Sequence, residues 1–260
     1  MTGERAPLSA GAPPEELERF YEQAYTSDPA EAERYSRWRA LGARGKADHV
    51  IALCRAGGIA PTSTLEVGCG DGALLSELYA RGFGGRLEGV EIAPAAVAIA
   101  GARAEIAAVR VYDGQHLPGE DAAHDLGILS HVLEHVPDPS ALLAETARAC
   151  RAVVLEVPLE DNLSARRASR REHSAEVGHL QRLDRAGARA LVHRAGLRVA
   201  GELEDPLPLA TQLFFAEGAA GHLRGWARWG VRAGLHHLAP ALARRLFTLH
   251  YAALCLPPGG

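Results

Sequence analysis

Residues 64–76 decide the fold of this chain, and they read Thr-Leu-Glu-Val-Gly-Cys-Gly-Asp-Gly-Ala-Leu-Leu-Ser. The start of the stretch has the apolar character of a short buried strand, and its end begins an apolar helix. Between them, Gly68, Gly70 and Gly72 form a turn with almost no side-chain bulk. A turn of this kind lets a ligand lie against bare backbone at a helix N-terminus, so we expect a ligand site here.

A dinucleotide is the first ligand class that fits this turn. Gly68, Gly70 and Ala73 match the G-x-G-x-x-G/A fingerprint, and Glu91 follows about 20 residues later, where a ribose-binding acid is expected. On its own this short pattern is weak. A nicotinamide-dependent oxidoreductase therefore stays an alternative.

A cationic ligand is the second class, and the local charge favours it. Residues 64–80 contain Glu66, Asp71 and Glu77 but no Lys or Arg. Three carboxylates repel a pyrophosphate, whereas they attract a ligand that carries a sulfonium and an ammonium.

Glu66, Gly68, Gly70 and Gly72 also resemble the first motif of class I S-adenosylmethionine-dependent methyltransferases. The resemblance implies an α/β, Rossmann-like fold with a seven-stranded, mostly parallel sheet. It also implies S-adenosylmethionine as the cofactor.

The rest of the chain fits this fold class. Strands are predicted at 63–68, 86–91, 107–112, 125–130, 152–157, 197–203 and 249–256, with helical segments between them. Such alternation predicts a parallel sheet covered on both faces. The order resembles the methyltransferase fold over about residues 60–204 plus the last strand.

Five segments are expected from composition and periodicity. They are a disordered leader (1–13), an N-terminal helical lid (14–58), the methyltransferase core (59–205), a helical insertion (206–248) and the last strand with its tail (249–260). The insertion comes where the family usually has a short connection. We expect it to form part of the substrate site.

Polar residues follow the predicted strands, where ligands of open α/β sheets bind. The resemblance implies that Glu91 accepts both ribose hydroxyls, that Asp113 receives the adenine amino group, and that the Gly114 backbone meets the ring edge. The predicted cofactor-binding residues are Glu66, Gly68, Gly70, Glu91, Ile92, Asp113, Gly114 and Ser130.

A second motif, residues 130–139, follows the fourth strand and reads Ser-His-Val-Leu-Glu-His-Val-Pro-Asp-Pro. It resembles quinone-pathway O-methyltransferases and, in its Glu-His pair, small-RNA terminal 2′-O-methyltransferases. In both families an acid followed by Glu-His can hold a divalent metal. Here His131 replaces the first acid, which suits Zn²⁺ or Mn²⁺ better than Mg²⁺.

His179 falls where the RNA enzymes supply a fourth ligand. His131, Glu134, His135 and His179 could thus form a metal cluster. A metal-free site, with His131 as the first candidate for a general base and His179 as the second, is an alternative, because histidine titrates near neutral pH. Purely positional roles for these residues are a third.

A basic stripe marks the insertion. Arg224, Arg228, Arg232 and His236 recur every fourth residue, the spacing of one helix face. The stripe could bind an acidic small-molecule acceptor, lie on an anionic membrane surface, or simply cover the core.

Composition sets outer bounds on function. The 260 residues carry a net charge of −4, so nucleic acid is not the first choice of partner. The four cysteines are scattered without a C-x-x-C pair, and neither a signal peptide nor an 18-residue apolar run is present, so a cytoplasmic location is expected. A homodimer is compatible with the sequence.

The sequence is therefore interpreted as a methyltransferase, with O-methylation of a small metabolite or natural product as the leading hypothesis. Three alternatives stay open. One is a metal-assisted methyltransferase of a lipid, a quinone or an RNA 3′ end. The others are the oxidoreductase and a non-catalytic cofactor-binding scaffold.

Overall fold

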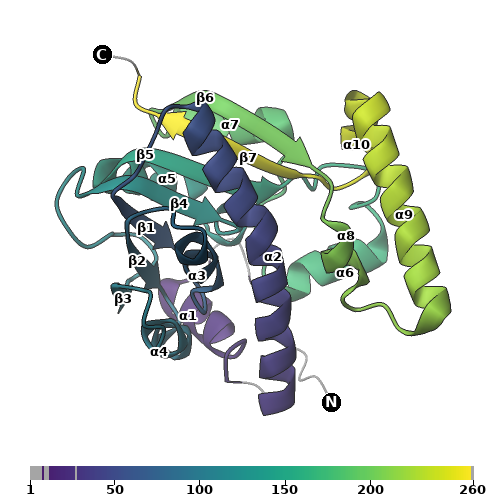
Figure 1. The fold of residues 1–260 in the computed structure, drawn as a ribbon, viewed down its shortest axis with the longest axis horizontal. Coiled ribbons are helices and arrows are strands. Elements are labelled where there is room, and N and C mark those ends of the chain that lie inside the picture. Colours follow the sequence, from purple (N-terminus) through teal and green to yellow (C-terminus); the bar gives the residue numbers. More distant parts are fainter. Residues whose placement is uncertain (1–7, 9–11, 27, 259–260) are drawn as a thin grey trace.

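A seven-stranded sheet in the order β3-β2-β1-β4-β5-β7-β6 organises the chain in a computed structural model (Figure 1). The structure describes residue 8, residues 12–26 and residues 28–258, so most of the predicted leader at 1–13 lies outside the described residues. The strands are β1 (Ser63–Val67), β2 (Arg86–Glu91), β3 (Ala108–Val111), β4 (His124–Ser130), β5 (Cys150–Pro158), β6 (Arg198–Asp205) and β7 (His250–Leu256).

The strand directions match the predicted class. β1 to β5 pair in parallel, and β7 runs antiparallel to both of its neighbours, β5 and β6. Each predicted strand begins and ends within two residues of an observed one. The prediction of a mostly parallel α/β sheet is confirmed.

Helices cover the sheet or extend beyond it. They are α1 (Pro14–Glu22), α2 (Pro29–Ala56), α3 (Ala73–Ala80), α4 (Pro94–Gly101), η1 (Leu133–His135), α5 (Pro139–Ala149), α6 (Ala168–Glu176), α7 (Arg185–Arg194), α8 (Leu209–Leu213), α9 (Gly218–Leu238) and α10 (Pro240–Leu246). Among the described residues, no helix is both long enough and apolar enough to span a bilayer.

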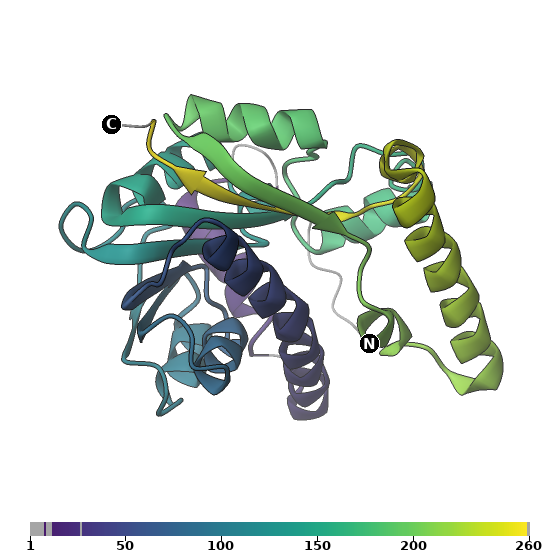
Figure 2. The same cartoon turned by 45° about the horizontal axis from the view of Figure 1, so that its top comes forward.

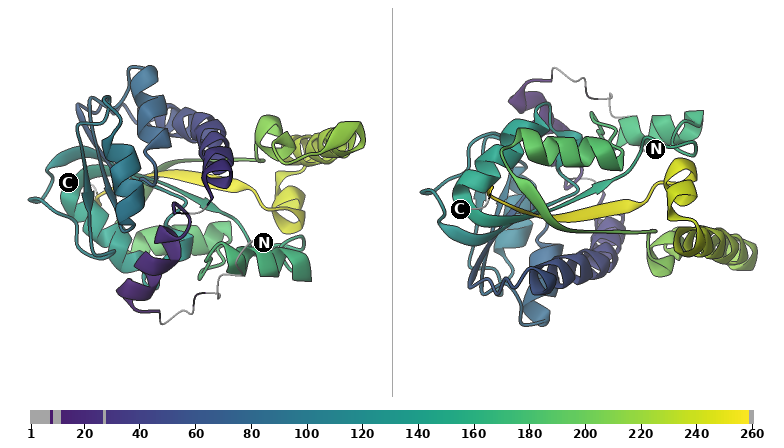
Figure 3. Two further views of the ribbon diagram at one scale, coloured as in Figure 1. Left: turned by 90° about the horizontal axis from the view of Figure 1, so that it is seen from below. Right: turned by 90° about the horizontal axis from the view of Figure 1, so that it is seen from above.

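Two apolar cores lie on opposite faces of the sheet because side chains alternate along each strand. In β5, Val153 and Leu155 join the core shared with α5 and α7, while Ala152 and Val154 join the core shared with α2 and α3. The views along the sheet show α2 and α7 on its two sides (Figure 3). β5 is thus apolar on both faces, as a central parallel strand should be.

The segment 206–248 is helical, as expected from its sequence. α8, α9 and α10 follow one another, and α9 stands away from the sheet (Figure 2). Its assignment as a lid over the substrate stays a prediction.

The turn between α3 and β2 is one place where glycine is required. Gly82 and Gly85 both have left-handed backbone, with φ of 63° and 64°. A Cβ at Gly82 would meet open space, whereas a Cβ at Gly85 would overlap the backbone carbonyl of Thr62.

We expect Gly82→Ala to lower the free energy of unfolding by about 1–2 kcal/mol, the cost of left-handed backbone for a residue with a Cβ. Gly85→Ala should lower it by more, because β1 and β2 must also separate. Urea unfolding of the two variants measures the difference, and equal losses would contradict the steric argument.

Candidate active site

The glycine turn after β1 is held by a carboxylate from the neighbouring strand. Glu91 accepts the backbone N–H groups of Gly70 (2.9 Å), Ile92 (2.7 Å) and Ala93 (3.2 Å). Burial raises the pKa of Glu91, and these three bonds act against that rise. Gly68 and Gly70 have φ of 70° and 54°, which glycine adopts readily.

Glu66 lies beside this turn with an unsatisfied carboxylate. Its side chain is 4% exposed, and its Oε2 has no hydrogen-bond partner among the described residues. Burial raises the pKa of Glu66 to about 8; nearby Lys46 acts against the rise, and Asp71 and Glu91 add to it. An unpartnered carboxylate oxygen of this kind readily accepts a hydrogen bond from a positively charged group.

Two residues from the N-terminal segment cover the turn. Arg39 of α2 donates to Asp71 at 2.8 Å, and its guanidinium lies 4.9 Å from the ring centre of Tyr25. A Cβ at Gly70 would lie 2.7 Å from the Tyr25 hydroxyl. Residues 64–80 contain no Lys or Arg, but the fold brings Arg39 to Asp71.

A cavity of about 880 Å³ opens on one side of the turn. Of the predicted cofactor residues, Gly68, Gly70, Glu91, Ile92, Asp113 and Gly114 line it. The Asp113 carboxylate accepts the N–H groups of Gln115 and His116, and these bonds, with the His116 side chain, lower its pKa to about 2.

A second cavity, of about 520 Å³, lies on the other side of the turn. Glu66, Ser130, His131 and His179 line it, together with Gly68 and Gly70. The buried Ser130 hydroxyl has no hydrogen-bond partner among the described residues. His131 lines both cavities, so it marks the place where they meet.

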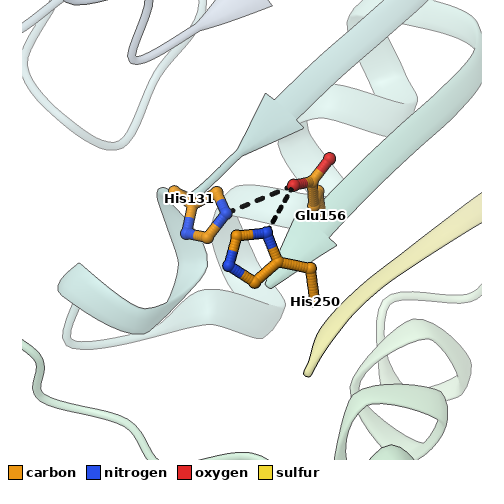
Figure 4. Close-up of side chains that lie close together, drawn as sticks. All are labelled: His131, Glu156 and His250. Atoms are coloured by element: carbon orange, nitrogen blue, oxygen red, sulfur yellow. Dashed lines mark hydrogen bonds and ion pairs between the residues drawn. The ribbon is translucent and has the colours of Figure 1, made fainter. Parts of the chain in front are cut away.

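His131 belongs to a cluster that the motif alone does not reveal. Its Nε2 lies 3.3 Å from Oε1 of Glu156, and Nδ1 of His250 lies 3.4 Å from the same oxygen. Figure 4 shows the three side chains converging from the loop directly after β4 and from β5 and β7. His131 also has left-handed backbone, with φ of 58°, a conformation that costs free energy and is found mainly at functional sites.

The fourth member of this neighbourhood is His49 of α2. Its Nδ1 lies 3.1 Å from Oε2 of Glu156, and its Nε2 lies 3.2 Å from Asp205. Burial opposes protonation of His49, but its bonds to Asp205 and Glu156 raise its pKa to about 10. Burial likewise opposes ionisation of Glu156, and the bonds from three histidines outweigh it and hold the pKa of Glu156 well below its usual range.

The four residues proposed from sequence as a metal cluster do not form one group. Glu134, His135 and His179 bring ligand atoms within 4.8 Å of one another, whereas His131 groups with Glu156 and His250. His131 still contacts Glu134 through Nδ1, at 3.1 Å. The division arises because the His131 ring lies between Glu134 and the β5 carboxylate.

His179 has its own acid partner. Its Nδ1 lies 2.8 Å from Oε2 of Glu160, and its ring centre is 4.7 Å from that of His135. A histidine oriented by a carboxylate through one nitrogen can take a proton at the other.

Sequence reasoning missed Glu156, His250 and His49. Glu156 gave a signal, as the one charged residue in the apolar run 152–157. His250 and His49 gave none, because they lie about 95 and 107 residues from Glu156 and no spacing rule joins them.

Basic side chains from three helices reach the second cavity, and those from α2 are Lys46 and Arg39, which pairs with Asp71. Arg170 of α6 and Arg232 of α9 line this cavity, so the predicted stripe contributes one residue to the cavity wall. Burial lowers the pKa of Arg232, and the nearby Arg170, Arg228 and Arg167 lower it further. Within the described part of the chain, none of these four arginines forms an ion pair.

The strand order, the reversed β7 and the glycine turn define the class I, Rossmann-like methyltransferase fold. A family described as methyltransferase domain matches residues 28–201 of this sequence. The chain belongs to that family.

Individual relatives are more distant. A ubiquinone biosynthesis O-methyltransferase of Acinetobacter baumannii is 31% identical over 106 residues, 38% of this chain and 42% of the relative. The match therefore spans less than half the length of that relative. An uncharacterized 37.1 kDa protein in transposon TN4556 of Streptomyces fradiae is 31% identical over 201 residues, 74% of this chain and 58% of that protein.

Among solved structures, the phosphoethanolamine N-methyltransferase 2 of Haemonchus contortus has the same fold, with a TM-score of 0.63 and 13% identity. The superposition covers 94% of this chain and 61% of that one. The Haemonchus contortus structure was solved in complex with phosphomonomethylethanolamine and S-adenosylhomocysteine.

Proposed function

We propose that this protein is an S-adenosylmethionine-dependent methyltransferase that methylates an oxygen atom of a small acidic acceptor. Membership of the methyltransferase-domain family supports the reaction class. The observation that carries the choice of donor is Glu66, a buried carboxylate with an unpartnered oxygen at a glycine turn. Such a group fits the ammonium of the donor, because a bound cation favours the ionised carboxylate, whereas a bound pyrophosphate disfavours it.

The chain provides a place for each part of the donor. Glu66 faces the ammonium, Glu91 the ribose hydroxyls, and Asp113 with Gly114 the adenine. Bound donor supplies a methyl group on a sulfonium. The residues around it hold the acceptor in line with that methyl, which is the main contribution a protein makes to such a displacement.

We expect S-adenosylhomocysteine to bind the wild-type protein and Glu91→Ala to weaken that binding by at least about tenfold, the value of one charge-assisted hydrogen bond. The variant also loses the acceptor that orders the Gly70 N–H. Isothermal titration calorimetry measures the affinities of the wild type and of the variant. Glu120 is an exposed acid away from the cavities, so Glu120→Ala should bind S-adenosylhomocysteine as the wild type does. Binding of NADH but not of S-adenosylhomocysteine would favour the oxidoreductase instead.

Donor affinity should rise with pH between 6 and 8. In the free protein Glu66, with a pKa of about 8, is mostly protonated in this range, and an ammonium bound beside it favours the ionised form. Binding must therefore release a proton, and the affinity gains up to about tenfold for each pH unit until Glu66 is already ionised. Calorimetry at several pH values measures the slope for wild type and Glu66→Gln; equal slopes would contradict this assignment.

The second cavity would take the ammonium end of the donor at Glu66. The rest of it, near His131 and Arg232, is the proposed acceptor site, since His131 lines both cavities. Similarity to ubiquinone biosynthesis O-methyltransferases supports oxygen as the methylated atom. Both ring nitrogens of His131 already face carboxylates, so we assign it to positioning and assign His179, paired with Glu160, to proton acceptance. The acceptor oxygen forms a bond to the methyl carbon, the carbon–sulfur bond breaks, and the hydroxyl proton goes to His179.

Arg170 and Arg232 support an acidic acceptor. Like charges placed together on a cavity wall repel one another, and an anionic ligand group relieves that repulsion. The fold neighbour from Haemonchus contortus, solved with a phosphorylated small molecule, is compatible with such an acceptor.

In the presence of S-adenosylhomocysteine, we expect 3,4-dihydroxybenzoate to bind more tightly than catechol, which lacks the carboxylate. Arg232→Ala should weaken 3,4-dihydroxybenzoate on the order of 10–100-fold and leave catechol unchanged. Arg224→Ala, on the same helix but not in the cavity wall, is the matched control. Calorimetry measures the affinities of both ligands for all three proteins. A preference for 3,4-dihydroxybenzoate that survives the loss of Arg232 would argue against this anchor.

A further inference from the structure

The cluster at the floor of the acceptor cavity has the spacing of a metal site. His131, Glu156 and His250 each offer a ligand atom within 4.8 Å of the other two. His131 Nε2 and His250 Nδ1 lie 3.3 and 3.4 Å from Oε1 of Glu156. Ligand bonds of about 2.0–2.2 Å in tetrahedral geometry place neighbouring ligand atoms roughly 3.3–3.5 Å apart. Both distances are long for N–H···O bonds, which cluster near 2.9–3.0 Å.

The fold fixes these three side chains before any ion binds. Glu156 and His250 project from adjacent antiparallel strands, where Glu156 pairs with Ala252 and Pro158 with His250. His131 follows directly on β4, whose last residue, Ser130, pairs with Glu156. Figure 4 shows the three groups pointing to one space.

A supporting shell of carboxylates and histidine surrounds the three ligand atoms. Nδ1 of His131, the nitrogen away from Glu156, lies 3.1 Å from Glu134. The second oxygen of Glu156 contacts Nδ1 of His49, and Asp205 lies 3.2 Å from the other ring nitrogen of His49. Protein metal sites orient their histidine and carboxylate ligands in this way.

The donor set selects the class of ion. Two imidazoles and one carboxylate suit Zn²⁺ and its transition-metal neighbours, not Mg²⁺ or Ca²⁺, which prefer oxygen. Three protein ligands also leave a coordination position open. All three residues line the acceptor cavity, so that position faces the acceptor.

We propose that His131, Glu156 and His250 bind a divalent transition-metal ion of the zinc class at the floor of the acceptor cavity. Its open position takes an oxygen of the acceptor, and the charge of the ion lowers the pKa of that hydroxyl. This role rests on the proposed methyl transfer, whereas the binding of the ion does not.

The test measures metal binding directly. Chelator-treated protein without a histidine tag is titrated with Zn²⁺ by calorimetry and with Co²⁺ by absorption spectroscopy. We expect one ion per chain and the visible bands of four-coordinate Co²⁺. His250→Ala should lower the Zn²⁺ affinity by more than the roughly 10–100-fold that loss of a supporting residue costs.

His179→Ala is the matched control, because it removes a histidine from the Glu134, His135 and His179 group but not from the proposed site. Retained Zn²⁺ binding in this variant supports the proposal. It is overturned if wild-type protein binds no Zn²⁺ at micromolar concentration, or if His179→Ala loses the ion and His250→Ala keeps it.

The melting temperature of metal-free His250→Ala, compared with that of metal-free wild type, shows whether the variant is folded. Asp205→Asn tests the same site through the carboxylate that contacts His49.

The binding of S-adenosylhomocysteine and the binding of Zn²⁺ together separate failure of this site from failure of the proposed function. S-adenosylhomocysteine binding without Zn²⁺ binding overturns only the metal site. Zn²⁺ binding without S-adenosylhomocysteine binding overturns only the proposed function.

Discussion

Four carboxylates lie buried where the central strands end, and the cost of burying them governs what surrounds the site. They are Glu66, Glu91, Glu134 and Glu156, each no more than 7% exposed. An uncompensated ion costs several kcal/mol in such a place. Glu91 is compensated by backbone N–H groups and Glu156 by histidines. Glu66 and Glu134 each keep one oxygen without a partner among the described residues, although His131 contacts the other oxygen of Glu134. Glu91 and Glu156 therefore have partners on both carboxylate oxygens, whereas Glu66 and Glu134 do not.

The same compensation ties distant segments together. His49 comes from the N-terminal helix α2 and His250 from the last strand, and both turn toward Glu156 in the middle of the sheet. Arg39, also from α2, reaches Asp71 beside the glycine turn. α2 is therefore held both at the glycine turn and at Glu156, and His131 lines both cavities.

Much of the fold could be predicted because its signals are local. The glycine turn and the apolar runs each depend on neighbouring residues, and both lie where the sequence indicates. The predicted cofactor residues also gather at one edge, since parallel strands end on the same side. Their binding roles stay predictions. The sequence grouped His131 with Glu134, His135 and His179, whereas the fold places it beside Glu156.

The sequence by itself determined the class of fold, the position of the ligand turn and the family to which the chain belongs, because periodicity and motif spacing are written in contiguous residues. Only the tertiary structure decided which side chains share the second cavity. Glu156, His250, His49 and Arg232 meet there through strand register and helix placement, which join residues 18 to 201 positions apart in the chain. No local pattern predicts that these side chains lie together, since their proximity depends on the order and register of strands across the whole sheet.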